Sequence, residues 1–229
     1  MSGRIILITG AKGGLGNFVT RKFLDAGDMV IGAALSVRQS DFPSTNFLDA
    51  ALDLTVADDV KFLVDNIANR FGHIDVLVHV AGGFAGGTPI HETDPKTWSQ
   101  MQNMNLNAAF NVFRAVIPHM RKEGRGRIIA VGSNAAVHPQ KNLGAYVVSK
   151  NALVTLVQTI ALENADRNIN ANLVLPGTMD TPANRAAMPD ADPKKWVNPA
   201  NVANVIYWLA SPEAAETSGA AIPITGREG

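Results

Sequence analysis

The sequence predicts an α/β fold with helices on both faces of a doubly wound, seven-stranded parallel sheet. Short runs of aliphatic and β-branched residues recur along the 229 residues without polar alternation, as strands buried on both faces require. Segments with apolar residues at helical spacing separate these runs, an order typical of βαβ units. No repeat, charge block or low-complexity linker interrupts the alternation, so we expect one domain over residues 1–229.

Each expected strand is an apolar run, and each expected helix is an amphipathic stretch between two such runs. In chain order the expected strands are Ile5–Thr9, Met29–Ala33, Asn46–Leu52, Val76–His79, Gly126–Gly132, Ile169–Val174 and Ala220–Ile224. The expected helices are Leu15–Ala26, Val56–Phe71, Trp98–Lys122, Ala145–Asn164 and Asn201–Ala210. The Pro-rich stretch Pro176–Pro199 indicates a loop with a short helix, which we expect to be a substrate loop.

Composition excludes several classes of function. Lys+Arg and Asp+Glu both number 20, so the chain has no net charge with which to attract nucleic acid or an anionic membrane. The absence of cysteine excludes disulfides and thiol chemistry, and the five histidines lack the spacing of metal ligands, so we expect no metal site. The first residues lack the features of a signal peptide, and no apolar stretch approaches the roughly 20 residues of a membrane span. We therefore expect a cytoplasmic protein.

A glycine-rich loop follows the first expected strand and opens the first expected helix. Residues 9–16 read TGAKGGLG. Glycines permit a tight turn and let the backbone approach a pyrophosphate, whose charge is stabilised by the N–H groups at the helix start. Such a loop alone can be a simple turn, but its place in a βαβ unit predicts a dinucleotide site.

Polar residues with acid–base chemistry lie later in the chain. Tyr146 and Lys150 are four residues apart on an expected helix and so project from one face. A nearby ammonium favours phenolate, which makes tyrosine usable as a proton donor and acceptor near neutral pH. Ser133 follows an expected strand, at the sheet edge where α/β proteins bind ligands. Together the three residues outline a site.

These motifs, in this order and spacing, resemble the short-chain dehydrogenase/reductase family over essentially the whole chain. The resemblance is carried by Gly10-x-x-x-Gly14-x-Gly16, Asp53, Ala81-Gly82, Asn105, Ser133, Tyr146-x-x-x-Lys150 and Pro176-Gly177. It implies a single Rossmann domain that binds NAD(H) or NADP(H) and moves hydride between nicotinamide and a carbonyl or imine-like carbon.

The same resemblance implies roles for individual residues. Tyr146 would be the general acid in reduction, and Ser133 would hydrogen-bond the substrate oxygen. Lys150 would bind the nicotinamide ribose and lower the pKa of the tyrosine, and Asn105 would anchor a proton-relay water. Cofactor contacts would come from Gly10, Gly14, Leu15, Gly16, Asp53, Leu54, Ala81, Gly82, Pro176, Gly177 and Thr181.

The chain departs from the family pattern at two places. His79-Val80 replaces two asparagines, so a hydrogen bond that braces the strands is supplied differently or lost. The segments Val80–Gly87 and Leu175–Arg185, followed by Met188–Asp192 and Trp196, resemble the dihydropteridine reductase branch, in which Phe84 would lie near a pterin. The alternative for Phe84 is an ordinary loop aromatic. Ser133 favours a true carbonyl substrate, and the loops do not identify the compound.

The end of the second expected strand bears on the choice of cofactor. NAD-specific proteins need a carboxylate near Ala34 to bind the ribose 2′-hydroxyl, and none is present. Ser36, Arg38 and Lys12 offer a hydroxyl and two cations to a 2′-phosphate. We therefore expect preference for NADP(H). The alternative is that both cations are ordinary surface charges and NAD(H) is also accepted.

Two further expectations concern activity and assembly. A non-catalytic dinucleotide sensor or scaffold is the alternative to an enzyme, but it would have no need for Asn105, Ser133, Tyr146 and Lys150 together. The family commonly pairs its two long helices across two-fold axes, here Trp98–Lys122 and Ala145–Asn164, so we expect a homodimer or homotetramer.

Overall fold

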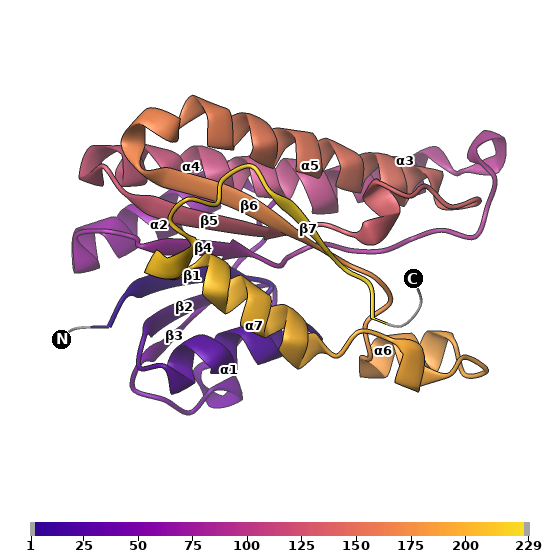
Figure 1. Cartoon of the computed structure of the whole chain (residues 1–229), viewed down its shortest axis with the longest axis horizontal. Coiled ribbons are helices and arrows are strands. Elements are labelled where there is room, and N and C mark those ends of the chain that lie inside the picture. The colour runs from indigo at the N-terminus through magenta and orange to yellow at the C-terminus, as the bar shows by residue number, and fades with distance from the viewer. Residues whose placement is uncertain (1–2, 227–229) are drawn as a thin grey trace.

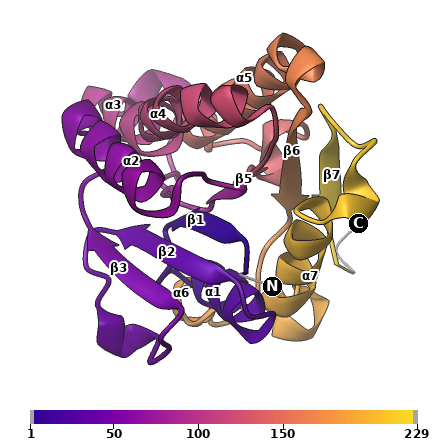
Figure 2. The same ribbon diagram turned by 90° about the vertical axis from the view of Figure 1, so that its left-hand side faces the viewer.

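The computed structural model describes residues 3–226 of the chain. It contains one parallel sheet of seven strands in the order β3-β2-β1-β4-β5-β6-β7, with helices on both faces (Figures 1 and 2). The strands are β1 (Ile5–Thr9), β2 (Met29–Ala34), β3 (Phe47–Ala51), β4 (Val76–His79), β5 (Gly126–Val131), β6 (Ile169–Pro176) and β7 (Ala221–Ile224). The predicted fold class is confirmed, and every predicted strand is present within two residues at each end.

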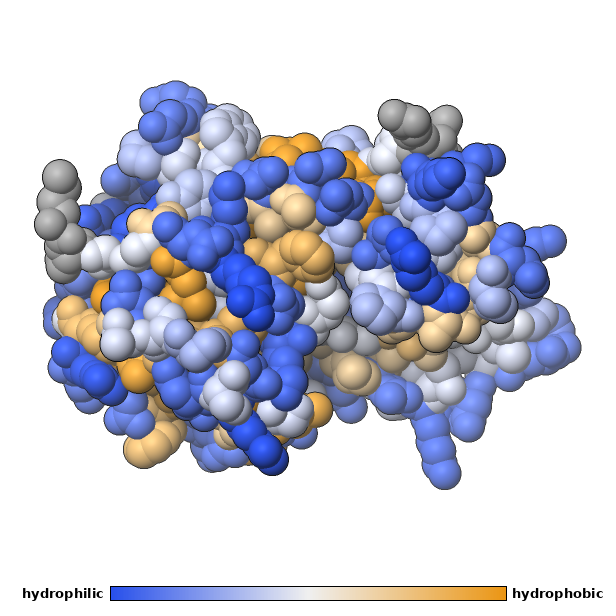
Figure 3. All heavy atoms as spheres, turned by 90° about the horizontal axis from the view of Figure 1, so that it is seen from below, coloured by the Kyte–Doolittle hydropathy of each residue, from blue (hydrophilic) through white to orange (hydrophobic). Residues whose placement is uncertain are grey.

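The helices form two layers. Those of the described residues are α1 (Gly16–Asp25), α2 (Ala57–Phe71), α3 (Pro95–Gln102), α4 (Ala108–Glu123), α5 (Gly144–Glu163), α6 (Pro182–Ala187) and α7 (Pro199–Leu209), besides single-turn 3-10 and π segments. Helices α2, α4 and α5 cover one face of the sheet, and α1 and α7 cover the other (Figure 2). Viewed from the side of α1, α6 and α7, the surface shows separate apolar patches among polar side chains (Figure 3).

Two hydrophobic cores, one on each face of the sheet, explain why the strands read as unbroken apolar runs. In β1, Ile5 and Leu7 join the core under α2, α4 and α5, whereas Ile6 and Ile8 join the core under α1 and α7. Side chains alternate across a strand, so a strand covered on both faces needs apolar residues at every position.

One predicted helix is wrong in detail. The stretch Trp98–Lys122 is interrupted by a π-helical turn at Asn103–Asn107, which separates α3 from α4. A π turn inserts one extra residue without breaking the apolar pattern around it, so spacing alone does not reveal it. Such turns are frequent at functional sites, and this one contains Asn105.

The expectation that no stretch reaches the length of a membrane span is also corrected. Helix α5 has 20 residues and is apolar enough, by length and composition, to cross a membrane. Half of its most apolar 18-residue window is buried in the structure, where Leu153, Val157 and Ile160 enter the core beneath it. Packing against the sheet therefore accounts for the buried half of the apolar residues of α5.

The strand order places a ligand crevice at one edge of the sheet. Strand β1 pairs with β2 on one side and with β4 on the other, so the chain reverses its direction of winding at β1. In open α/β sheets such a switch point opens a crevice outside the carboxyl ends of the strands. The loops after β1, β4, β5 and β6 all begin at that edge.

Candidate active site

The glycine-rich loop after β1 lies tightly against the loop after β4. Gly10 has a φ of +66°, and a Cβ on it would lie 2.8 Å from the backbone nitrogen of Ala81. A Cβ on Gly16 would overlap the carbonyl oxygen of Gly10. Side chains at these two positions would force the loops apart, so the close turn predicted from the glycine spacing is present.

The start of α1 is suited to a pyrophosphate. Helix α1 begins at Gly16, and Leu15 before it supplies no side-chain cap. The first turn holds no acidic residue. The N–H of Asn17 donates to the carbonyl oxygen of Gly13 at 2.9 Å and that of Val19 to Leu15 at 3.1 Å, so what the first turn offers an anion is chiefly the positive end of the helix dipole.

A histidine and a threonine brace the strand ends beneath this loop. Nδ1 of His79 lies 2.9 Å from Oγ1 of Thr9, and the backbone N–H of Ala81 donates to the same oxygen at 3.3 Å. Burial, with a smaller contribution from the charge of Lys150, lowers the pKa of His79 to about 3, so the ring is neutral near pH 7. At the position where the family pattern has two asparagines, His79 thus supplies a hydrogen bond that braces the ends of β1 and β4.

Tyr146 and Ser133 meet at the carboxyl edge of the sheet. Tyr146 lies in the first turn of α5, and Ser133 follows β5 and caps a short 3-10 turn by accepting from the N–H of Ala135 at 3.2 Å. Burial raises the pKa of Tyr146 above its ordinary value, and a hydrogen bond with Ser133 opposes this effect. The predicted lowering of this pKa by Lys150 is wrong for the chain alone, and near pH 7 Tyr146 is a protonated phenol.

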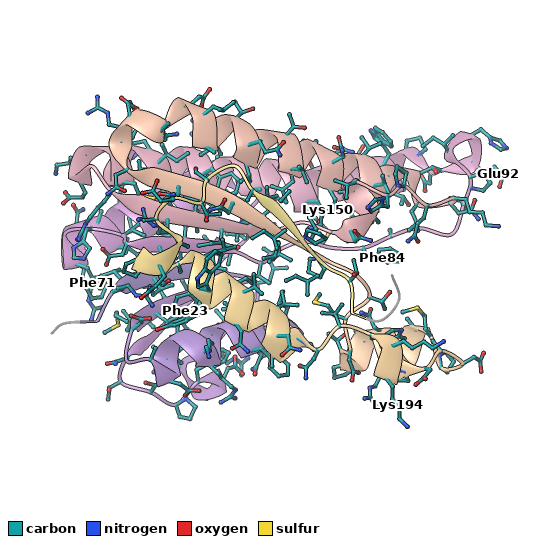
Figure 4. All side chains as sticks on the ribbon, in the orientation of Figure 1. Phe23, Phe71, Phe84, Glu92, Lys150 and Lys194 are labelled. Carbon is teal, nitrogen blue, oxygen red and sulfur yellow. The ribbon has the colours of Figure 1, made fainter. Side chains whose placement is uncertain are left out.

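Lys150 lies one helical turn beyond Tyr146 and is buried. Its Nζ donates to the carbonyl oxygen of Val131 at the end of β5, at 3.0 Å. Burial lowers the pKa of Lys150 to about 8, because the interior disfavours its charged form. Figure 4 shows Lys150 and Phe84 on neighbouring segments near the middle of the molecule, with Glu92 and Lys194 farther out.

Asn105 ties the loop after β4 to α5. Its Oδ1 accepts from the N–H of Gly83 at 2.8 Å, and its Nδ2 donates to the Gly83 carbonyl at 3.1 Å and to Oγ of Ser149 at 3.0 Å. Ser149 in turn donates to the carbonyl oxygen of Tyr146 at 2.7 Å. Sequence reasoning missed Ser149, although its place inside the Tyr-x-x-x-Lys motif puts it near the buried face of the helix.

Phe84 packs against the Tyr146 ring from the loop after β4. The two ring centroids are 5.0 Å apart with an interplanar angle of 70°, and Phe84 is 66% exposed. A Cβ on Gly82 would lie 2.7 Å from Oδ1 of Asn105 and 3.1 Å from Nζ of Lys150. The loop therefore lies close over the polar side chains of the catalytic region, with an aromatic ring beside the phenol.

The expected nicotinamide end is formed by the loop after β6. The N–H of Gly177 donates to the carbonyl of Ile224 at 2.9 Å, and Oγ1 of Thr181 caps α6 by accepting from Asn184 at 3.2 Å. A Cβ on Gly14 would lie 3.0 Å from the methyl group of Thr181. The predicted cofactor residues after β1 and β6 are thus in contact across the crevice.

The expected adenosine end is exposed and carries an unexpected carboxylate. Ser36 and Arg38 are exposed after β2, and Lys12 forms an ion pair with Asp41, Nζ to Oδ1 at 3.0 Å. Asp53 is also exposed and accepts from Thr55 through its Oδ1, while the adjacent Leu54 side chain is buried. Sequence reasoning missed Asp41, because it lies beyond the strand end where a specificity carboxylate was sought.

Among residues 3–226, no group of three or more His, Asp or Glu side chains is close enough to hold a metal ion. The side chains gathered at the crevice are instead a phenol, a hydroxyl, an amide and an amine. This set suits proton transfer to and from a bound organic substrate.

Comparison with known proteins agrees with this geometry. A family model described as short chain dehydrogenase matches residues 4–192. A 3-oxoacyl-[acyl-carrier-protein] reductase of Thermotoga maritima is 31% identical over 241 residues, covering 99% of this chain and 98% of that protein. An L-fucose dehydrogenase of Mus musculus is 28% identical over 247 residues, covering 98% of this chain and 88% of that protein.

Solved structures have the same fold. The structure titled "ElxO with NADP Bound" superposes with a TM-score of 0.92 at 25% identity and covers 98% of both chains. The aldohexose dehydrogenase of Thermoplasma acidophilum superposes with a TM-score of 0.88 at 28% identity, covering 98% of this chain and 93% of that chain.

Proposed function

The chain belongs to the short chain dehydrogenase family, and from that premise we propose an NADPH-dependent oxidoreductase that transfers hydride between nicotinamide and a small carbonyl substrate. The observation that carries the proposal is that Tyr146 and Ser133 meet at the carboxyl edge of the sheet, one helical turn from the buried Lys150. The loops after β1, β4 and β6 that would hold the nucleotide meet at the same edge of the sheet.

The residues at this edge divide the proton chemistry between them. The loops after β1, β4 and β6 would hold a reduced nicotinamide cofactor, which would supply hydride to the carbonyl carbon. Tyr146, protonated near pH 7, gives its phenolic proton to the carbonyl oxygen, which the Ser133 hydroxyl holds by a hydrogen bond. Once the nucleotide is bound, the charged form of Lys150 would stabilise the phenolate left on Tyr146, an effect that the chain alone does not show. Asn105 holds Gly83 and Ser149 in place around this pair.

For the cofactor, we propose a preference for NADPH. No carboxylate stands at Ala34, the last residue of β2, and Ser36, Arg38 and Lys12 offer polar and cationic groups beyond it. The ElxO structure, of similar fold, is titled as NADP-bound. The test is fluorescence titration of wild type and Arg38→Ala with NADPH and NADH. Arg38→Ala should weaken NADPH binding alone. Tighter NADH binding by wild type, or equal weakening of both, would reject the preference.

Two substrate classes are compatible with the loops. Carbonyl compounds are the favoured class because Ser133 is present beside Tyr146. A quinonoid dihydropterin is second, supported by the contact of Phe84 with the Tyr146 ring. The segment 176–199, which includes α6, would cover either substrate. The test follows NADPH oxidation with 3-oxoacyl thioesters, aldoses, simple ketones and a quinonoid dihydropterin.

That assay also separates an enzyme from a sensor. We expect turnover with at least one carbonyl compound. Tight NADPH binding with no turnover of any compound would favour the non-catalytic alternative. Turnover of the dihydropterin alone would reverse the order of the two substrate classes.

We further propose that the protein assembles through the outer faces of α4 and α5. Phe110 on α4 and Leu162 on α5 are 48% and 82% exposed, and Val148 on α5 is 45% exposed. Burying these side chains against a second copy would remove apolar surface from water. Light scattering at micromolar concentration should give the mass of a dimer or tetramer, and a mass near 24.3 kDa would reject this assembly.

A further inference from the structure

One carboxylate lies between the cations of the adenosine end. Asp41 is the last residue of a 3-10 turn, Gln39–Asp41, that follows β2. Its Oδ1 lies 3.0 Å from Nζ of Lys12, and its Oδ2 accepts from the backbone N–H of Arg38 at 2.9 Å. Asp41 therefore contacts both residues that the proposed function assigns to a 2′-phosphate.

The carboxylate is ionised and only partly shielded. The side chains of Lys12 and Asp41 are 43% and 22% exposed. The hydrogen bond with Lys12, followed by that from the Arg38 backbone, lowers the pKa of Asp41 below its ordinary value. Near pH 7 Asp41 therefore neutralises Lys12 and places a negative charge beside any phosphate that approaches it.

We propose that Asp41 is a specificity-determining residue that limits the preference of this site for a 2′-phosphorylated nucleotide. The inference rests on the proposed function. To reach Lys12, a 2′-phosphate must displace the Asp41 carboxylate or share the ammonium with it. The phosphate is also repelled by the carboxylate, because like charges at this distance interact unfavourably.

The charge of Asp41 should have little effect on the affinity for a nucleotide without the 2′-phosphate. Both carboxylate oxygens already have partners, Lys12 and the Arg38 N–H, so a ribose 2′-hydroxyl would have to share them. A neutral hydroxyl is neither repelled by the carboxylate nor strongly attracted to Lys12. Removing the charge of Asp41 should therefore act on the phosphorylated ligand and leave the other almost unchanged.

The test is calorimetric titration with adenosine 2′,5′-bisphosphate and adenosine 5′-monophosphate, which differ only in the 2′-phosphate. Asp41→Asn keeps an oxygen that can accept from the Arg38 N–H while it removes the charge. We expect Asp41→Asn to bind the bisphosphate about fivefold more tightly than wild type, the scale of one exposed charge pair, and to bind the monophosphate within twofold of wild type.

Asp25→Asn is the matched control. Asp25 is an exposed residue at the far end of α1 and forms no ion pair with any residue between 3 and 226, so this variant changes net charge equally. It should leave both affinities unchanged. A second variant, Lys12→Met, should weaken bisphosphate binding, and adding Asp41→Asn to it should give a smaller gain than in wild type.

Three outcomes would overturn the inference: unchanged or weaker bisphosphate binding by Asp41→Asn, equal tightening of both ligands, or equal tightening in Asp25→Asn. Failure of the proposed function would look different, because wild type would then bind neither NADPH nor NADH. Wild type that binds NADPH, together with no bisphosphate gain in Asp41→Asn, would reject the role of Asp41 alone.

Discussion

The catalytic end and the adenosine end of the candidate site differ in how deeply their polar groups are buried. At the catalytic end, Asn105, Ser149 and Lys150 are buried, and burial is the main cause of the pKa shifts of Tyr146 and Lys150. At the adenosine end Ser36, Arg38 and Lys12 are exposed and Asp41 is partly exposed, and the pKa of Asp41 falls because of hydrogen bonds with its neighbours. Desolvation thus sets the protonation of the catalytic end, and we propose that opposing surface charges set the nucleotide selectivity of the adenosine end.

This difference predicts how each end responds to change. A buried group is little screened by salt and is costly to leave without a partner. An exposed ion pair contributes little to stability and weakens with salt. Mutations at the catalytic end should therefore have large effects on rate or folding, and changes at the adenosine end should have small effects on selectivity.

The largest effect is expected for Tyr146→Phe. The substitution keeps the ring beside Phe84 and removes the phenolic proton, so turnover should fall by about 10²–10⁴-fold, the usual contribution of a general acid. Nucleotide affinity, measured by NADPH fluorescence, should change little. Turnover equal to that of wild type, on the substrate identified, would remove Tyr146 from the mechanism.

Asn105→Ala should reduce the free energy of unfolding, because Asn105 holds a hydrogen-bond network at the buried catalytic end. The substitution leaves the N–H and carbonyl of the half-buried Gly83 without their partner, while the Ser149 hydroxyl keeps its bond to the Tyr146 carbonyl. Unpaired buried polar groups cost about 1–3 kcal/mol each, so the free energy of unfolding in urea should fall by at least about 1 kcal/mol. A loss below about 0.5 kcal/mol, as for an ordinary surface substitution, would mean that this network is not needed to hold the loop.

The buried lysine predicts a pH dependence of stability. The pKa of Lys150 is about 8 in the folded chain and near 10.5 when unfolded, so between these values the unfolded state binds more protons and stability rises with pH. Urea unfolding of wild type and Lys150→Met should show that the free energy of unfolding of wild type rises relative to that of the variant from pH 8 to 10. The rise should be at most about 1.4 kcal/mol per pH unit. Below about pH 6.5 the difference should be constant. A constant difference over the whole range would contradict the lowered pKa.

The smallest effect is expected from salt at the adenosine end. Raising ionic strength from about 0.05 to 0.5 M should weaken binding of adenosine 2′,5′-bisphosphate by up to about fivefold, since exposed charges are screened within about 10 Å at 0.1 M. Binding of adenosine 5′-monophosphate, measured alongside it, should fall less. If salt weakens the binding of both ligands equally, the 2′-phosphate makes no charge contact of its own.

Sequence predicted the buried parts of the molecule better than the exposed ones. The strands were found because burial on both faces demands unbroken apolar runs, as in Ile5–Thr9. The structure also brings Ser133 together with Tyr146, as the motifs led us to expect, and it places Thr181 against Gly14, a contact that the sequence did not predict.

The misses have physical causes. Pairing Tyr146 with Lys150 in sequence suggests a charge effect, but the direction of the tyrosine shift depends on burial, which spacing does not report. The π turn at Asn103–Asn107 keeps the apolar pattern of a continuous helix. Asp41 contacts Lys12 only because the 3-10 turn folds back toward the glycine-rich loop, a contact between residues 29 positions apart.

The most direct test of the account is the titration of the Tyr146 phenol itself. The chain has two tyrosines, so ¹³Cζ-labelled tyrosine gives two NMR signals, and Tyr146→Phe identifies the one of interest. If burial controls the catalytic end, Tyr146 in the nucleotide-free protein should titrate above the ordinary tyrosine pKa of 10.0, with the same midpoint at low and high salt. A midpoint below 10.0, or one that shifts strongly with salt, would show that charge and not burial governs the proton donor.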